Sequence, residues 1–325
     1  MNASGTARRL LAGLIVVALA GGCSSSPPTV KKTADIAYEA SNPALTPGVL
    51  DVYAPANAGP WPVVVMFPAG DKSELGVYAR RVADLGFVVF VPTWGLGPGG
   101  GVGPLTNDGL LAAMSQGACA VEFARAHAAE YGGDPATMVV FGHSAGAHPA
   151  AMAAFARPEP TAGCLGGPTL GAIDAMVTWD GNWLLSINVP DWDSALAADP
   201  RVMDAITPWT YLAAHKDQKV VILVSELRSE DPGPPEREVG DPWAADSWLA
   251  VRDPSGDLRR QLEANGAFAD GTIGYADSQQ LLYSVLKAQG NPVTLDVLPG
   301  STHITLSDAG WKVFLAAFPR AAAKD

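Results

Sequence analysis

The sequence predicts an α/β fold around a mostly parallel β-sheet, and three features predict it. Apolar, β-branched runs such as WPVVVMFPAGD (61–71) and FVVFVPTWG (87–95) lack polar alternation, which is typical of strands buried on both faces. Segments with helical spacing separate these runs, for example at 78–86 and 107–131. The run at 137–142 ends in a glycine-flanked serine and leads directly into an alanine-rich helix. Buried strands that alternate with helices form parallel sheets with helices on both faces.

The expected strands can be placed in chain order. The segment VLDVYAP (49–55) alternates in polarity and stops at Pro55, so it predicts a strand. The stretch after Gly95 is too rich in glycine for regular structure, and it lacks the Lys-Ser/Thr of a phosphate-binding loop. We expect strands at 49–55, 61–71, 87–95, 137–142, 172–181, 219–227 and 291–300.

Composition excludes some classes of protein. Of the 325 residues, 48% are apolar and 17% are charged, as in a globular chain that buries a core. The net charge of −12 argues against a nucleic-acid partner, because phosphate binding needs a basic surface. No His, Cys or Asp cluster has metal-ligand spacing and no cofactor motif is present, so we expect no metal and no cofactor.

The N-terminal segment resembles the signal of a bacterial lipoprotein. Arg8 and Arg9 precede an apolar stretch that is too short to span a bilayer, and this stretch ends in LAGGC at Cys23. The resemblance implies cleavage before Cys23 and lipid attachment to that cysteine, although Ala20 stands where leucine is common. An ordinary secretory signal that is cut nearby is the alternative, and both versions export the protein.

The lipoprotein resemblance also sets the expected domain boundaries. The segment after Cys23 is polar and rich in proline, as a tether would be. We expect membrane anchoring on the extracytoplasmic side, with a signal peptide at 1–22, a lipidated tether at 23–44 and a single domain at 45–325.

Two further cysteines allow two interpretations. Cys119 and Cys164 form an even pair in an exported protein, where disulfides persist, and this predicts a disulfide between them. The alternative is two separate buried thiols, which pack like small apolar residues. The sequence does not give the geometry of the pair, so both stay open.

The segment GHSAG (142–146) predicts a nucleophilic serine. Gly-x-Ser-x-Gly between a strand and a helix is the nucleophile elbow, a tight turn that holds the serine in a strained backbone conformation. Gly142 and Gly146 lack side chains where neighbouring backbone passes close. We expect the Ser144 hydroxyl to project above the sheet at the helix N-terminus, where backbone amides favour developing negative charge.

A serine nucleophile needs a base, and His303 is the expected base among five histidines. It follows the last expected strand in VLPGSTH, where a loop at the carboxyl edge of the sheet can deliver an imidazole to Ser144. His143 cannot reach round to the hydroxyl of its neighbour. The remaining histidines are expected on helices or on the surface, and they are His127, His148 and His215.

Four segments together resemble the α/β-hydrolase family, in particular its esterase- and lipase-like carboxylesterases. They are LDVYAPANAGPWPVVVMFPAGD, DLGFVVFVPTW, EYGGDPATMVVFGHSAGAHPAA and SQQLLYSVLKAQGNPVTLDVLPGSTH. The resemblance covers residues 45–318. It implies an α/β-hydrolase fold with an eight-stranded, mostly parallel sheet and helices on both faces. It also implies a Ser–His–acid triad, an acyl-enzyme intermediate and a small carboxylic-ester substrate.

The expected oxyanion hole departs from the family pattern. Such enzymes often carry His-Gly-Gly after the third strand, where this chain has Phe67, Pro68, Ala69 and Gly70. The amide of Ala69 or Gly70 can supply one donor, and the amide of Ala145 can supply the second. Loss of one such donor costs on the order of 3 kcal/mol of transition-state stabilisation.

The acid of the triad is open between several carboxylates. The family's acid follows the strand at 219–227, but Arg228 stands there and cannot orient an imidazole. The stretch DGTIGYADSQQLLYSVLKAQG resembles the family's passage from acid to helix, which favours Asp270 and makes 229–269 an insertion and a candidate lid. The rivals are Asp231 and Glu230, and the weaker alternatives are Glu226 and Asp180.

These residues predict an exported serine hydrolase that cleaves a carboxylic ester. The alternative is a non-catalytic ligand-binding lipoprotein on a hydrolase scaffold, which Arg228 and the altered oxyanion segment favour. Labelling by a fluorophosphonate separates the two, because only an activated serine reacts.

Overall fold

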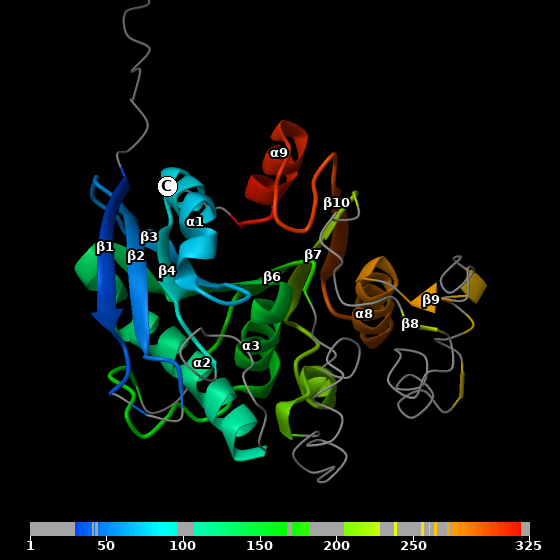
Figure 1. Cartoon of the computed structure of the whole chain (residues 1–325), viewed down its shortest axis with the longest axis horizontal. Helices are drawn as coiled ribbons and strands as arrows, with labels where there is room; N and C mark the ends of the chain where they lie inside the picture. Colours follow the sequence, from blue (N-terminus) through cyan, green and yellow to red (C-terminus); the bar gives the residue numbers. More distant parts are fainter. Residues whose placement is uncertain are drawn as a thin grey trace, which may run out of the picture.

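An eight-stranded sheet with the order β1-β2-β4-β3-β5-β6-β7-β10 forms the centre of this computed structural model (Figure 1). Its strands are β1 (Val30–Ala37), β2 (Val49–Pro55), β3 (Trp61–Phe67), β4 (Val88–Pro92), β5 (Gly133–His143), β6 (Ala175–Trp179), β7 (Lys219–Ser225) and β10 (Val293–Leu298). A two-stranded sheet pairs β8 (Arg237–Glu238) with β9 (Thr272–Ile273). The structure describes residues 30–40, 42, 45–95, 107–167, 171–181, 205–227, 237–238, 255–256, 260, 263–264, 272–273 and 275–319.

Most neighbouring strands of the large sheet run parallel. β2 pairs antiparallel with β1 and with β4, and the other neighbours pair in parallel. The predicted mostly parallel sheet of eight strands is confirmed, and each expected strand overlaps an observed one. Parallel strands direct their carboxyl ends to a common edge, so the turns after β3, β5, β6, β7 and β10 meet there.

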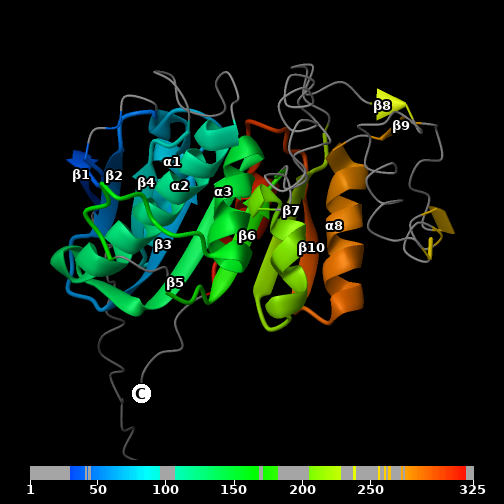
Figure 2. The ribbon, with the colours of Figure 1, turned by 90° about the horizontal axis from the view of Figure 1, so that it is seen from below.

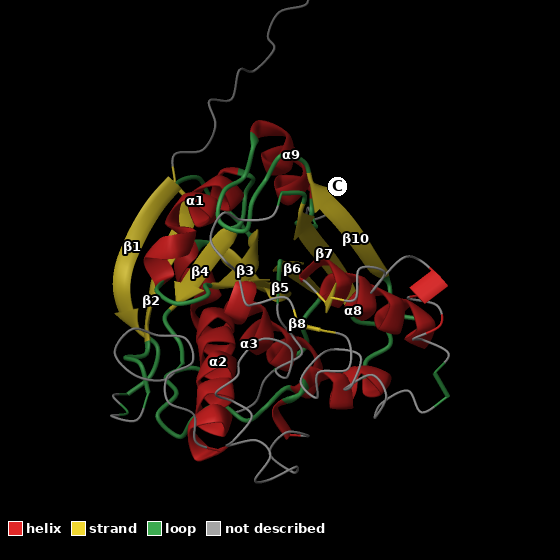
Figure 3. Cartoon of the chain, turned by 45° about the vertical axis from the view of Figure 1, so that its right-hand side comes forward, coloured by secondary structure: helices red, strands yellow, loops and turns green. Residues whose placement is uncertain are grey.

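Helices cover both faces of the sheet, as predicted. α1 (Gly76–Asp84) and α9 (Asp308–Ala316) lie on one face (Figure 3). α2 (Asn107–His127), α3 (Ala147–Ala151) and α8 (Tyr275–Gln289) lie on the other, which Figure 2 shows from below. In the described part of the chain, no helix is both long enough and apolar enough to cross a membrane.

The central strand β3 divides its side chains between two cores. Val63 and Val65 belong to the core under α2, α3 and α8, whereas Val64 and Met66 belong to the core under α1 and α9. All four side chains are fully buried. This double burial explains the continuous apolar run in the sequence, because neither face of a central parallel strand meets water.

The first strand, β1, corrects the predicted domain boundary. The sequence analysis assigned 23–44 to a tether, but β1 pairs antiparallel with β2 and belongs to the sheet. Residues 30–37, which the sequence analysis placed in the tether, are therefore part of the folded domain. Most side chains of β1 are exposed, so its sequence VKKTADIA resembles a polar linker. Backbone pairing holds it in place, and composition does not reveal that pairing.

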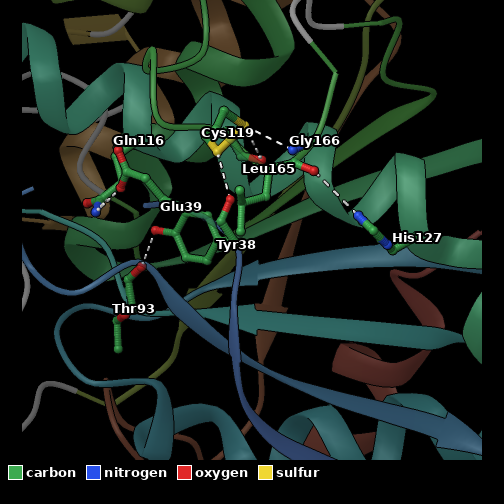
Figure 4. The surroundings of a disulfide bond; sticks show 9 residues. Tyr38, Glu39, Thr93, Gln116, Cys119, His127, Leu165 and Gly166 are labelled. Carbon is green, nitrogen blue, oxygen red and sulfur yellow. Dashed lines mark hydrogen bonds between the residues drawn. A yellow bond between two sulfur atoms is a disulfide. The ribbon is translucent and has the colours of Figure 1, made fainter. Parts of the chain in front are cut away.

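Cys119 and Cys164 are joined by a disulfide, which was the first of the two interpretations of this pair (Figure 4). Cys119 lies in α2. The backbone of Cys164 forms an isolated antiparallel β-bridge with Glu39, just after β1. The bond closes a loop with a sequence separation of 45. In the chain-entropy model a loop of this length contributes about 4 kcal/mol to the free energy of unfolding.

A buried carboxylate ties β1 to the segment that follows β3. Asp51 on β2 is 1% exposed and forms ion pairs with Lys32 (2.7 Å) and with Lys72. It also accepts a hydrogen bond from the Asp35 N–H at 3.1 Å. Burial alone would raise the pKa of the Asp51 carboxyl, but the hydrogen bonds from Lys32, Lys72 and Asp35 outweigh burial and lower it below its ordinary value.

The variant Asp51→Asn should lower the free energy of unfolding by about 1–3 kcal/mol at neutral pH, because it removes a charged hydrogen-bond acceptor from two lysines. A carboxyl whose pKa is lowered by folding stabilises fully above its unfolded pKa of about 3.9, and this stabilisation is lost as the pH falls through the lower folded pKa. The difference between variant and wild type should therefore shrink below about pH 4.

Urea unfolding of both proteins between about pH 3 and pH 7 measures this difference. The exposed Asp296 provides the control, because Asp296→Asn also removes one carboxylate. If the difference in the free energy of unfolding between wild type and Asp51→Asn is as large at about pH 3 as at about pH 7, the lowered pKa of Asp51 is contradicted.

Candidate active site

Ser144 occupies the turn between β5 and α3 in a left-handed backbone conformation, with φ at 51°. A Cβ at Gly142 would lie 2.3 Å from Cα of Ala147, and a Cβ at Gly146 would lie 2.2 Å from the carbonyl oxygen of Phe67. Neither position has room for a side chain, so the tight turn requires both glycines. This is the geometry that the GHSAG segment predicts for an elbow.

The contact at Gly146 brings the segment after β3 directly against the elbow. The Pro68 carbonyl oxygen is 2.5 Å from the same Cβ position. The buried Trp94 donates from Nε1 to that oxygen at 2.9 Å and fixes its orientation. Ala69, the next residue along the chain, therefore follows a segment that is held beside Ser144.

The predicted oxyanion donors differ in what they contact. The Gly70 N–H donates to Oε2 of Glu74 at 3.3 Å, and the Asp71 N–H donates to Oε1 at 3.1 Å. The Gly70 N–H therefore has a carboxylate acceptor in this structure, and its role as an oxyanion donor stays a prediction. No described residue accepts from the Ala69 N–H. Ala145 lies in the first helical turn, where amides have no intrahelical acceptor, so Ala69 and Ala145 remain as donors.

His303 and Asp180 form a hydrogen-bonded pair at the same edge of the sheet. His303 follows β10, and its Nδ1 lies 3.3 Å from Oδ2 of Asp180, which directly follows β6. Asp180 is 4% exposed, and its Oδ1 accepts from the Ser225 N–H at 2.9 Å. An ionised carboxylate only accepts hydrogen bonds, so Nδ1 of His303 is the donor in this pair and Nε2 is the ring nitrogen left to face other groups.

His143 links this pair to the elbow. Its Nε2 lies 2.7 Å from the carbonyl oxygen of His303, and the two imidazole rings are 4.9 Å apart. A carbonyl only accepts, so Nε2 of His143 donates. Burial, reinforced by the neighbouring His303, lowers the pKa of His143 to about 4, and the ring is neutral at physiological pH. The residue before Ser144 thus contacts the backbone of the residue that carries the expected base.

The expected acids fall into two groups. Asp270, Asp231 and Glu230 lie outside the described residues, as does Arg228, and their roles stay predictions. Glu226, a weaker alternative, is described and accepts from the Gly300 N–H at 2.6 Å.

Among the described carboxylates, Asp180 is the one that contacts His303, although the sequence analysis placed it among the weaker alternatives. It follows β6, whereas the family resemblance put the acid after β7. Two sequence signals point to it: an Asp-Gly pair directly after a buried strand, and a carboxylate at the edge that carries the serine.

The other histidines lie elsewhere in the fold. His127 pairs with Glu130 at 2.7 Å, and His148 is buried in α3. Among the described residues, no three His, Cys, Asp or Glu side chains come together as a metal site.

Comparison with known proteins places the chain among esterase-type folds. The BD-FAE family matches residues 50–166, a segment that contains the elbow. The comparison with curated proteins gave no match. Solved structures of a thermophilic esterase from Thermogutta terrifontis are similar. The butyrate-bound form has a TM-score of 0.54 and 17% identity, over 89% of this chain and 91% of that chain.

The same esterase phosphorylated by paraoxon has a TM-score of 0.53 and 17% identity, over 90% of this chain and 92% of that chain. A bifunctional GH43-CE protein of Bacteroides eggerthii has a TM-score of 0.59 and 17% identity, over 88% of this chain. Our chain spans 37% of the length of that protein. Together with the strand order, these similarities show that the chain has the α/β-hydrolase fold.

Proposed function

We propose that this protein is a serine hydrolase that cleaves carboxylic esters, with Ser144 as nucleophile, His303 as base and Asp180 as the acid of the triad. The observation that carries the proposal is the pairing of His303 with the buried Asp180 beside the Ser144 elbow. The BD-FAE match and the esterase neighbours support the same reaction class.

The proposed reaction proceeds through an acyl-enzyme. The Ser144 oxygen attacks the acyl carbon while Nε2 of His303 takes its proton, and the carbonyl oxygen becomes an oxyanion. The N–H groups of Ala69 and Ala145 stabilise this oxyanion. His303 then returns the proton to the departing alkoxide, which leaves as an alcohol. A water molecule repeats the sequence and releases the carboxylic acid.

Asp180 supports each proton transfer without accepting a proton itself. Its hydrogen bond holds His303 in the Nδ1–H tautomer, and its charge stabilises the imidazolium that forms. The Ser225 N–H occupies the second carboxylate oxygen and fixes the carboxylate plane.

A second candidate function is ligand binding without hydrolysis. One observation favours it: the Glu74 carboxylate engages the Gly70 amide in the segment where such enzymes place oxyanion donors. A negative charge there opposes a developing oxyanion.

Ser144→Ala should abolish hydrolysis of p-nitrophenyl butyrate and labelling by a fluorophosphonate, while leaving thermal unfolding unchanged, because it removes only a hydroxyl. Ser284→Ala is the control, since it removes a hydroxyl from α8. Equal hydrolysis by wild type and Ser144→Ala, after background correction, would end the nucleophile assignment. A folded wild type that is neither labelled nor active would favour the binding function.

Asp180→Asn should lower kcat by about a thousandfold or more, because the amide no longer enforces the His303 tautomer. Asp270→Asn, made in parallel, should change kcat little. Steady-state kinetics and unfolding midpoints of both variants measure this. The reverse pattern, with the loss confined to Asp270→Asn, would transfer the acid role to Asp270.

We further propose that the protein is exported and anchored to the membrane by lipid on Cys23. The LAGGC segment supports this, and β1 begins at Val30, so only residues 24–29 separate the lipid from the sheet. A fully extended chain of that length spans about 25 Å, which keeps the domain near the membrane surface.

Cys23→Ser removes the thiol that would accept the lipid, so the variant should leave the detergent phase in a Triton X-114 partition of cells. Ser24→Ala is the control, since it leaves the thiol in place. A Cys23→Ser variant that partitions into detergent like wild type would contradict lipid attachment at this residue.

A further inference from the structure

The loop that carries His303 is held by bonds within itself and from its neighbours. Thr302 donates its N–H to the Thr305 carbonyl at 2.9 Å, and the Ser307 N–H donates to Oγ of Ser301 at 3.2 Å. The Leu227 N–H, just after β7, donates to the Ser301 carbonyl at 2.9 Å. These bonds set the loop's shape, but they do not by themselves determine where the loop lies relative to the elbow.

Three side chains from three different elements bind the next three carbonyls of this loop. Ser225 Oγ on β7 donates to the Thr302 carbonyl at 2.9 Å. His143 Nε2 on β5 donates to the His303 carbonyl at 2.7 Å. Tyr78 Oη on α1 donates to the Ile304 carbonyl at 3.0 Å. The three donors come from separate elements, so together they restrain the backbone around His303 more than bonds from one element would.

One buried residue contacts all three donors. Trp179, at the end of β6, is fully buried, and its Nε1 donates to Ser225 Oγ at 2.9 Å. Its ring lies 4.4 Å from the ring of His143 and 5.3 Å from the ring of Tyr78. His143 and Trp179 are also direct partners in the parallel register of β5 and β6. The donors are therefore positioned by the core and not by the loop that they hold.

The state of His143 suits this task. Burial keeps it neutral, so it places no positive charge beside the imidazolium that His303 becomes during catalysis. Among the described residues its Nδ1 has no hydrogen-bond partner, so the hydrogen bond that its ring makes there is the one from Nε2 to the His303 carbonyl.

We propose that Tyr78, His143 and Ser225 are positioning residues, which align the His303 imidazole between Ser144 and Asp180 by binding the Thr302, His303 and Ile304 carbonyls. This inference rests on the proposed function and extends it from the triad to the residues that set its geometry. A structural role alone would stabilise the loop without affecting the imidazole.

Two variants that remove a donor, and one that restores it, test the proposal. Tyr78→Phe keeps the ring, which stacks on Trp311 at 5.0 Å, and removes only the hydroxyl donor. His143→Met removes the donor with similar volume, whereas His143→Gln keeps an N–H near the place of Nε2. Tyr78→Phe and His143→Met should each lower kcat about tenfold with KM unchanged. The base acts on the reacting groups only in the transition state, so its displacement weakens transition-state stabilisation and leaves substrate binding as it was. His143→Gln should recover most of the loss. Ser225 is not substituted, because its removal would also leave the buried Trp179 Nε1–H without its acceptor.

The control is a side chain that binds backbone carbonyls at the opposite edge of the sheet. Asn291, just before β10, donates from Nδ2 to the carbonyls of His215 (2.7 Å) and Gln218 (3.3 Å). Asn291→Ala should lower the unfolding midpoint at least as much as Tyr78→Phe and leave kcat unchanged.

A readout that is independent of activity is the ¹⁵N imidazole spectrum of His303, assigned with His303→Gln and recorded across pH. Tyr78→Phe and His143→Met should shift the His303 titration and its Nδ1–H signal, whereas Asn291→Ala should not. Wild-type kcat together with unchanged His303 signals in both variants would overturn the proposal. If the wild type neither hydrolyses esters nor takes the fluorophosphonate label, the proposed function fails, and the spectrum alone decides whether these residues position the imidazole.

Discussion

The backbone contacts at Gly142 and Gly146 are the constraint on which the candidate site depends. They allow β5, the first turn of α3 and the end of β3 to approach more closely than any side chain would permit. The cost is the left-handed conformation of Ser144, which persists because the surrounding sheet leaves the turn no alternative. Ser144 on such a turn is held by a buried central strand, and the segment after β3 is brought alongside by the same contact.

The end of β6 extends this rigidity to the base. Trp179 and Asp180 are adjacent in the chain, and both contribute to the surroundings of His303. Trp179 packs against the side chains that bind the loop, and Asp180 binds the imidazole itself. The parallel register of β5, β6 and β7 aligns His143, Trp179 and Leu223 side by side, so the geometry of the base derives from strand pairing. In a site built in this way, strand register sets the positions of the side chains, and the loops add only local adjustments.

The sequence was sufficient for the features that are local. The buried strands, the elbow and the position of His303 after the last strand all follow from short patterns. Asp180 was only a weaker alternative among the acids, because its contact with His303 spans 123 positions and depends on which strand ends beside the loop. The contact between the Gly70 amide and the Glu74 carboxylate was not predicted, because the sequence does not show whether Glu74, four residues along the chain, turns back onto that amide. β1 was missed because its stabilisation comes from backbone pairing and from the buried Asp51, neither of which changes its polar composition.

β1 also determines where the sheet stops. Among the described strands it lies at the edge of the sheet, and an edge strand presents backbone groups that a strand from another molecule could use. The pairing with β2 is irregular between Thr33 and Ile36, and Asp35 there adopts a left-handed φ of 57°. Lys31 and Lys32 are exposed on the same strand. A local bulge and a pair of lysines make this edge a poor template for intermolecular strand addition, so the part of the chain that most resembles a linker protects the protein against aggregation.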